Sequence, residues 1–139
     1  IICRGVVSMH MTRANIDRLT EFCREHLADA VRAVGIVHDD EVDPAYMRED
    51  LQRRYTDAEL EGLEDAAVRT SEAFQGLNTY QTSLGQSHAG LFAFEDAFLL
   101  LIPCGEDEAA YVSLDRSVSE DLSAFIKRCN DRLFSGSPA

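Results

Sequence analysis

Two side chains in this sequence, Cys104 and His38, have the chemistry of an enzyme nucleophile or base. Cys104 ends an apolar run beside Gly105, where a loop could expose its thiol. His38 ends a β-branched run beside Asp39, which could orient its imidazole as a general base. A reactive thiolate needs a histidine or another cation beside it, and no motif pairs a histidine with Cys104. We therefore expect a polar strand end at His38, a buried thiol at Cys104 and no catalytic residue.

The acidic clusters and the glycines also lack the patterns of metal, phosphate or nucleotide sites. Carboxylates are densest at residues 39–43 and 106–108, but a calcium loop needs alternating Asp or Asn, a central glycine and a distant glutamate. The chain contains no CxxC pair, GxSxG elbow, Walker loop or GxGxxG fingerprint. We expect solvated turns at both clusters, and neither a metal nor another cofactor.

Cysteine usage and hydropathy favour a cytoplasmic setting. Cys23 and Cys129 fall on apolar helical faces and Cys104 closes an apolar strand, which favours reduced, buried thiols. No apolar run approaches the roughly 18 residues of a membrane-spanning helix, so we expect no membrane partner.

Charge is the most unusual property of the sequence. There are 25 acidic residues against 13 basic ones, for a net charge of −12, and Lys127 is the only lysine. At molar salt the Debye length is about 3 Å, so repulsion among surface carboxylates is screened while they stay hydrated. Because the acids are spread along the whole chain, they favour a halophilic protein over an acidic protein with a basic partner. The same composition disfavours nucleic-acid binding, which needs a basic face.

Basic residues are concentrated only at Arg48, Arg53 and Arg54, which could engage an acidic or phosphate-bearing partner. Acidic residues stand close by in the same stretch. We expect the arginines to form ion pairs instead, with Glu49, Asp50 and Asp57.

The first part of the chain predicts a helix followed by a β-hairpin. Apolar residues at helical spacing predict a helix over Thr12–Asp29, capped at its first residue or at Asn15. The β-branched run Ala30–His38 predicts a strand. Val42–Arg48 predicts its return strand, which Pro44 confines to a sheet edge because proline cannot donate to a ladder.

Two helical segments follow the hairpin. Glu49–Tyr55 predicts a short helical turn, and Thr56-Asp-Ala-Glu59 has the form of a capping box. We expect the second helix to reach Phe74 and to stop at Gly76. Residues 77–85 have no clear period and predict a connector or a weak strand. The apolar stripe of the second helix is Leu60, Leu63, Ala67, Ser71 and Phe74.

The most apolar stretch, Ala89–Asp115, predicts three strands over His88–Phe94, Ala97–Pro103 and Ala109–Asp115. The run AFLLLIP at 97–103 is apolar at every position, so we expect it to be the central strand, covered on both faces. Alternation in the last strand predicts half exposure. Residues 117–120 have the form of a second capping box, which is expected to open an amphipathic helix through Leu133.

These elements predict a single α+β domain over residues 12–134 with a five-stranded, mainly antiparallel sheet and the order α-β-β-α-β-β-β-α. We expect residues 1–11 to be an extra or weakly ordered segment, with a short added edge strand as the alternative. Residues 135–139 are expected to be a flexible tail.

The element order over residues 12–134 resembles the roadblock/longin (profilin-like) architecture. That resemblance implies a five-stranded antiparallel sheet between one helix on one face and two on the other. It also implies a dimer that serves as a scaffold or as a regulator of small GTPases. No residue motif supports the resemblance, so it carries over no site residue.

A second resemblance rests on REDLQRRYTDAELEGL and on FEDAFLLLIPCGEDEAAYVSLDRS followed by a helix. These segments are similar to a family of small haloarchaeal proteins of uncharacterised function, over residues 28–133. The resemblance implies a haloarchaeal, cytoplasmic origin and implies no reaction.

We therefore expect a non-enzymatic halophilic domain that acts through protein contacts, as a homodimer joined by edge-strand pairing or helix packing. The alternatives are a ligand-sensing domain with a pocket between sheet and helix, and a small enzyme that uses Cys104 or His38.

Overall fold

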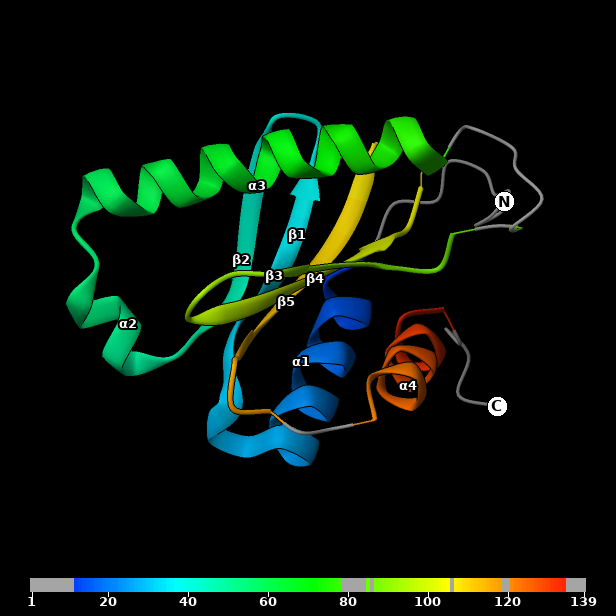
Figure 1. The fold of residues 1–139 in the computed structure, drawn as a ribbon, viewed down its shortest axis with the longest axis horizontal. Helices are drawn as coiled ribbons and strands as arrows, with labels where there is room; N and C mark the ends of the chain where they lie inside the picture. The colour runs from blue at the N-terminus through cyan, green and yellow to red at the C-terminus, as the bar shows by residue number, and fades with distance from the viewer. Residues whose placement is uncertain (1–11, 79–84, 86, 106, 119–120, 135–139) are drawn as a thin grey trace.

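The computed structural model shows a five-stranded antiparallel sheet with helices packed on both faces (Figure 1). It describes residues 12–78, 85, 87–105, 107–118 and 121–134. The elements in chain order are α1 (Arg13–Leu27), η2 (Ala28–Ala30), β1 (Val31–His38), β2 (Glu41–Met47), α2 (Glu49–Arg54), α3 (Asp57–Asn78), β3 (Gly90–Ala93), β4 (Ala97–Pro103), β5 (Glu108–Asp115) and α4 (Leu122–Phe134). The expected α+β fold is confirmed, while the expectations for residues 1–11, 79–84 and 135–139 lie outside the described residues.

The strand order β2-β1-β5-β4-β3 places the last strand of the sequence at the centre of the sheet. The expectation that 97–103 would be central and that 109–115 would be half exposed is therefore wrong. β5 is buried except at Ser113 and Asp115, whereas the first three residues of β4 are only partly buried. The physical reason is a long-range contact: β5 pairs with β1 and so joins the two hairpins, β1–β2 and β3–β4.

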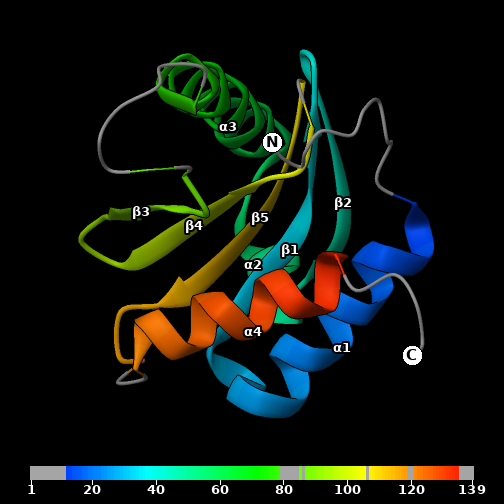
Figure 2. The same cartoon turned by 90° about the vertical axis from the view of Figure 1, so that its right-hand side faces the viewer.

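Helices cover the two faces of the sheet unequally (Figure 2). α1 and α4 lie on one face and bury a large apolar cluster that includes Leu19, Leu100 and Phe125. α3 crosses the other face, over a smaller cluster formed by Ala33, Val37, Phe74, Leu101 and Tyr111. One helix on one face and two on the other is the arrangement that the roadblock/longin resemblance implies.

Side-chain caps fix the starts of α1 and α3. The Thr12 hydroxyl accepts from the Asn15 amide, and the Asn15 side chain accepts from the Thr12 amide, so both residues form one capping box. In the same way, Thr56 and Glu59 each accept from the other's backbone N–H, at 3.1 and 2.9 Å. Both predicted caps are therefore confirmed.

The second capping box, at residues 117–120, is wrong in its position. Ser117 lies in a turn, and α4 begins at Leu122 because the Asp121 carboxylate accepts from the Ala124 amide at 3.2 Å. Glu120 lies outside the described residues.

The end of α3 also differs from expectation, because the helix continues through Gly76 to Asn78. A glycine inside a helix costs only about 1 kcal/mol relative to alanine, so it does not stop a helix by itself. The predicted apolar stripe is correct at Ser71 and Phe74, which are buried, but Leu63 is 47% exposed. Figure 1 shows the reason: the N-terminal half of α3 projects past β2 and beyond the sheet.

Gly35 permits a close approach of β1 to its two neighbouring strands. It lies opposite Tyr111 on β5 and Pro44 on β2, where the β1–β2 register shifts. A Cβ atom at this position would stand 2.6 Å from Tyr111 Oη and 2.7 Å from the Asp43 carbonyl oxygen. Burial, with the nearby charges of Glu64 and Asp43, raises the pKa of Tyr111, so its phenol stays neutral.

We predict that Gly35→Ala destabilises the fold by about 1–3 kcal/mol, the usual cost of overpacking, because the Asp43 backbone must move. Urea unfolding followed by circular dichroism measures the loss. The matched control is Gly62→Ala on α3, where an added Cβ meets nothing within 4 Å. It is expected to stabilise by about 0.5–1 kcal/mol. Equal unfolding midpoints for the two variants would contradict the close approach.

Candidate interaction surfaces

Two exposed apolar side chains lie on the β3–β4 hairpin. They are Leu91 on β3 and Phe94 at the hairpin turn, exposed by 40% and 55%. Leu63 is also exposed, by 47%, but it lies apart from them, in the N-terminal half of α3. Within the described residues β3 pairs with β4 alone, so its outer edge is open. We call Leu91 and Phe94 the β3-edge patch.

The β3–β4 hairpin is held in place by Arg116, which follows β5. The Arg116 guanidinium donates to the Phe94 carbonyl oxygen at 2.5 Å and lies over the Phe98 ring, 4.7 Å from its centroid. Between the hairpin and α3, Phe92 and Leu99 oppose each other and are only partly buried. Partly buried apolar side chains therefore stand next to the β3-edge patch, on the face of the sheet that α3 covers.

A second feature is a polar network at the other end of the central strands. Arg32 on β1 is only 9% exposed and donates to Asp115 at 3.2 Å and to the Tyr55 hydroxyl at 3.0 Å. A buried guanidinium requires such partners. The network ties β1 to β5 and to the residue that ends α2.

Arg48 completes this network from the end of β2. It donates to the second Asp115 oxygen at 2.9 Å, to the Asp50 carboxylate at 2.6 Å and to the Asp29 carbonyl oxygen at 2.6 Å. The hydrogen bond from Arg48 lowers the pKa of Asp50, and its carboxylate partners raise the pKa of Arg48. The predicted ion pairing of Arg48 with Asp50 is confirmed, whereas its pairing with Asp115, 67 residues away, was not predicted.

The other two arginines of this stretch lie at the surface. Arg53 pairs with Glu49 at 3.5 Å, as expected, and both side chains are well exposed. Arg54 lies over the Tyr55 ring, 5.8 Å from its centroid.

The two residues considered for catalysis lie in different environments. His38 Nδ1 is 3.0 Å from the Glu108 carboxylate, and its Nε2 is 3.6 Å from that of Asp39. His38 and Glu108 oppose each other on β1 and β5, so this contact joins the two strands at the end of the sheet. Cys104 is buried, 3% exposed, in the core beneath α1 and α4. Its burial separates the thiol from any substrate in solution.

The buried thiols of Cys23 on α1 and Cys129 on α4 are also protected. A hydrogen bond with Cys129 and burial raise the pKa of Cys23, so the thiol stays protonated. Among the described residues, histidine, cysteine and carboxylate side chains form no group of three that could hold a metal ion.

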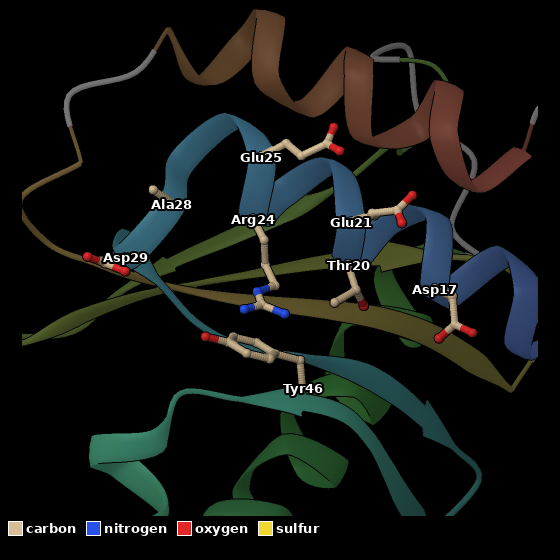
Figure 3. Close-up of a pocket in the computed structure, with 8 residues that line it drawn as sticks. All are labelled: Asp17, Thr20, Glu21, Arg24, Glu25, Ala28, Asp29 and Tyr46. Atoms are coloured by element: carbon tan, nitrogen blue, oxygen red, sulfur yellow. The ribbon is translucent and has the colours of Figure 1, made fainter.

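A groove of about 580 Å³ lies between α1 and β2 (Figure 3). Across it the Arg24 guanidinium lies 4.4 Å from the centroid of the Tyr46 ring. Its walls are polar and acidic, unlike the apolar sheet–helix pocket expected of a ligand-sensing domain. The lining residues are Asp17, Thr20, Glu21, Arg24, Glu25, Ala28, Asp29 and Tyr46.

Sequence reasoning identified neither surface. Leu91 and Phe94 were assigned to a predicted strand whose edge position is set by long-range pairing. Tyr46 falls in the predicted edge strand, and the available signal was the spacing of Asp17, Glu21 and Glu25, which recur every four residues along the predicted helix.

Comparisons with known proteins agree with this geometry. The family described as "Domain of unknown function (DUF7522)" matches residues 17–134. A solved structure described as "MglB with tetrameric arrangement" has a TM-score of 0.56 at 18% identity, over 93% of this chain and 94% of that chain. MglB from Myxococcus xanthus has a TM-score of 0.56 at 19% identity, over 88% and 90%. A Roadblock/LC7 domain from Streptomyces avermitilis has a TM-score of 0.52 at 10% identity, over 76% and 82%.

At these identities the likeness shows the fold, which is the roadblock/LC7 α+β fold. No curated protein matches the chain. None of the helices in the described part of the chain has the length and hydropathy needed to cross a bilayer.

We predict that Arg48→Lys lowers the free energy of unfolding by about 1–3 kcal/mol, because lysine keeps the charge but loses the fork that bridges Asp50 and Asp115. Urea denaturation measures the change. Arg53→Lys is the matched control, since its exposed pair with Glu49 is expected to contribute less than about 0.5 kcal/mol. A loss as large in Arg53→Lys as in Arg48→Lys would refute the structural role of the network.

Proposed function

The chain belongs to the DUF7522 family, a family of unknown function, and we propose that it is a non-enzymatic protein-interaction module that works as a homodimer. The observation that carries this proposal is the β3-edge patch, where two large apolar side chains, Leu91 and Phe94, are exposed beside an open strand edge. Grouped apolar surface of this kind marks interaction sites in folded proteins.

A second copy of the chain is the partner that fits this surface. Two β3 strands can pair in antiparallel fashion about a two-fold axis and extend the two sheets into one. The same axis would bring α3 of one copy against the exposed sheet face of the other, next to Phe92 and Leu99. The dimer would then cover Leu91 and Phe94 together.

The fold supports a scaffolding or regulatory role. The roadblock/longin resemblance implies scaffolds and regulators of small GTPases, and the structural neighbours are described as MglB and as a Roadblock/LC7 domain. One of these neighbours is described in a tetrameric arrangement, which supports assembly through this fold. We propose that the dimer presents its helices to a further protein, such as a small GTPase. The burial of Cys104 supports a role without catalysis.

We also propose a halophilic, cytoplasmic setting. The net charge of −12 and the single lysine support the halophilic proposal, because surface carboxylates repel one another unless salt screens them. The buried, reduced thiols of Cys23, Cys104 and Cys129 support a reducing compartment.

Light scattering in molar KCl is expected to show a dimer that Phe94→Asp or Leu91→Asp converts to a monomer. A charge at the centre of the interface should raise the dimer dissociation constant by about 30-fold or more, as for other interface hot spots. Phe134→Asp is the matched control, since Phe134 on α4 is 44% exposed but lies outside the β3-edge patch. A monomeric wild type, or dissociation of the Phe134→Asp variant to the same degree, would argue against this interface.

Circular dichroism during stepwise removal of KCl tests the halophilic proposal. The helical signal is expected to disappear as the Debye length grows from about 3 Å at molar salt to about 10 Å at 0.1 M. Sucrose at equal osmolality is the control, since it strengthens burial without screening charge. An unchanged spectrum in salt-free buffer, or full protection by sucrose, would show that charge screening does not hold the fold together.

A further inference from the structure

The edge of the sheet opposite the β3-edge patch is open and polar. β2 pairs with β1 and with no other strand among the described residues, so one row of its backbone groups faces outward. Its exposed residues are Glu41, Asp43 and Pro44. This edge therefore offers strand pairing without a large apolar surface. Such an edge suits a partner that binds transiently.

The groove between α1 and β2 runs beside this edge and is acidic along one wall. Asp17, Glu21 and Glu25 repeat every four residues on α1, and Asp29 continues the wall into η2. Like charges at this spacing disfavour an isolated helix. Their repeat of about 6 Å along the helix is close to the 6.6–6.8 Å between alternate side chains of a β-strand. Alternate basic side chains of an added strand would match the wall.

Arg24 lines the groove, and its guanidinium stacks on an aromatic ring. Figure 3 shows its side chain and Tyr46 pointing toward one another from α1 and β2. Its guanidinium lies over the Tyr46 ring and, within the described part of the chain, forms no ion pair with the surrounding carboxylates. A guanidinium has five N–H donors. Stacked on the ring, it can direct them to backbone carbonyl oxygens of a chain that lies in the groove.

We propose that the groove between α1 and β2 binds an extended segment of another protein that is rich in arginine or lysine, and that this segment adds a strand to the open edge of β2. Main-chain hydrogen bonds to β2 hold the segment, as in other cases of strand addition. Its basic side chains face Asp17, Glu21 and Asp29, and Arg24 donates to its carbonyl oxygens. This surface is separate from the β3-edge patch, so a dimer can bind one segment on each subunit.

The probe is a fluorescein-labelled octapeptide in which arginine alternates with valine, followed by fluorescence anisotropy at the lowest salt at which circular dichroism shows the folded protein. Saturable binding is expected. A peptide with glutamate in place of arginine should not bind, and N-methylation of alternate amides should abolish binding because it removes the donors of the strand ladder. Absence of saturable binding, or equal binding of the N-methylated peptide or the glutamate peptide, would overturn the proposal.

Charge-neutral variants test the position of the site. The double variant Glu21→Gln, Asp29→Asn is expected to weaken binding about tenfold, as for the loss of two charged contacts. Glu61→Gln, Glu72→Gln on the exposed face of α3 removes the same charge elsewhere and should leave the affinity unchanged. Equal weakening in the two double variants would show attraction by overall charge and would overturn a local site. Phe94→Asp should retain binding, which separates this test from that of the dimer.

Discussion

The antiparallel pairing of β1 with β5 is the contact on which the rest of the fold depends. It runs from Val31 opposite Leu114 to His38 opposite Glu108 and joins two hairpins that are otherwise local. Polar contacts close both ends of this pairing, with His38 against Glu108 at 3.0 Å and Arg32 against Asp115 at 3.2 Å. Both helical layers pack on the faces of these two strands. Without this pairing the sheet would separate into two hairpins, and a hairpin alone is at best marginally stable.

Local sequence patterns predicted most of the fold because the relevant interactions are local. Thr12 and Thr56 cap helices through residues three positions away. Pro44 lies in an edge strand because proline has no N–H to donate to a strand ladder. The central strand was misassigned because hydropathy records burial but not which strands are neighbours. The continuation of α3 past Gly76 and the start of α4 at Leu122, after Asp121, show that a local start or stop signal does not by itself set the end of a helix.

The candidate surfaces were less predictable for the same reason. Arg48 stood out in the sequence, but its partner Asp115 is brought to it only by the completed sheet. Leu91 and Phe94 are ordinary residues of an apolar strand until β3 becomes an edge. Tyr46 faces Arg24 only because β2 folds back beside α1. The sequence did contain the acidic row on α1, but the role proposed for it in binding a basic segment depends on the open edge of β2 beside it.

Pro44 has a consequence for how far assembly can proceed. It lies in the outer strand of the sheet and leaves one N–H fewer for an added strand, while the exposed Glu41 and Asp43 beside it repel a second acidic copy and attract a basic segment. In the proposed dimer, the joined sheet ends on both sides in a β2 strand whose carboxylates disfavour pairing with β2 of another copy. This arrangement favours a closed pair over continued growth into a filament. A dimer of this kind would remain dispersed at high concentration.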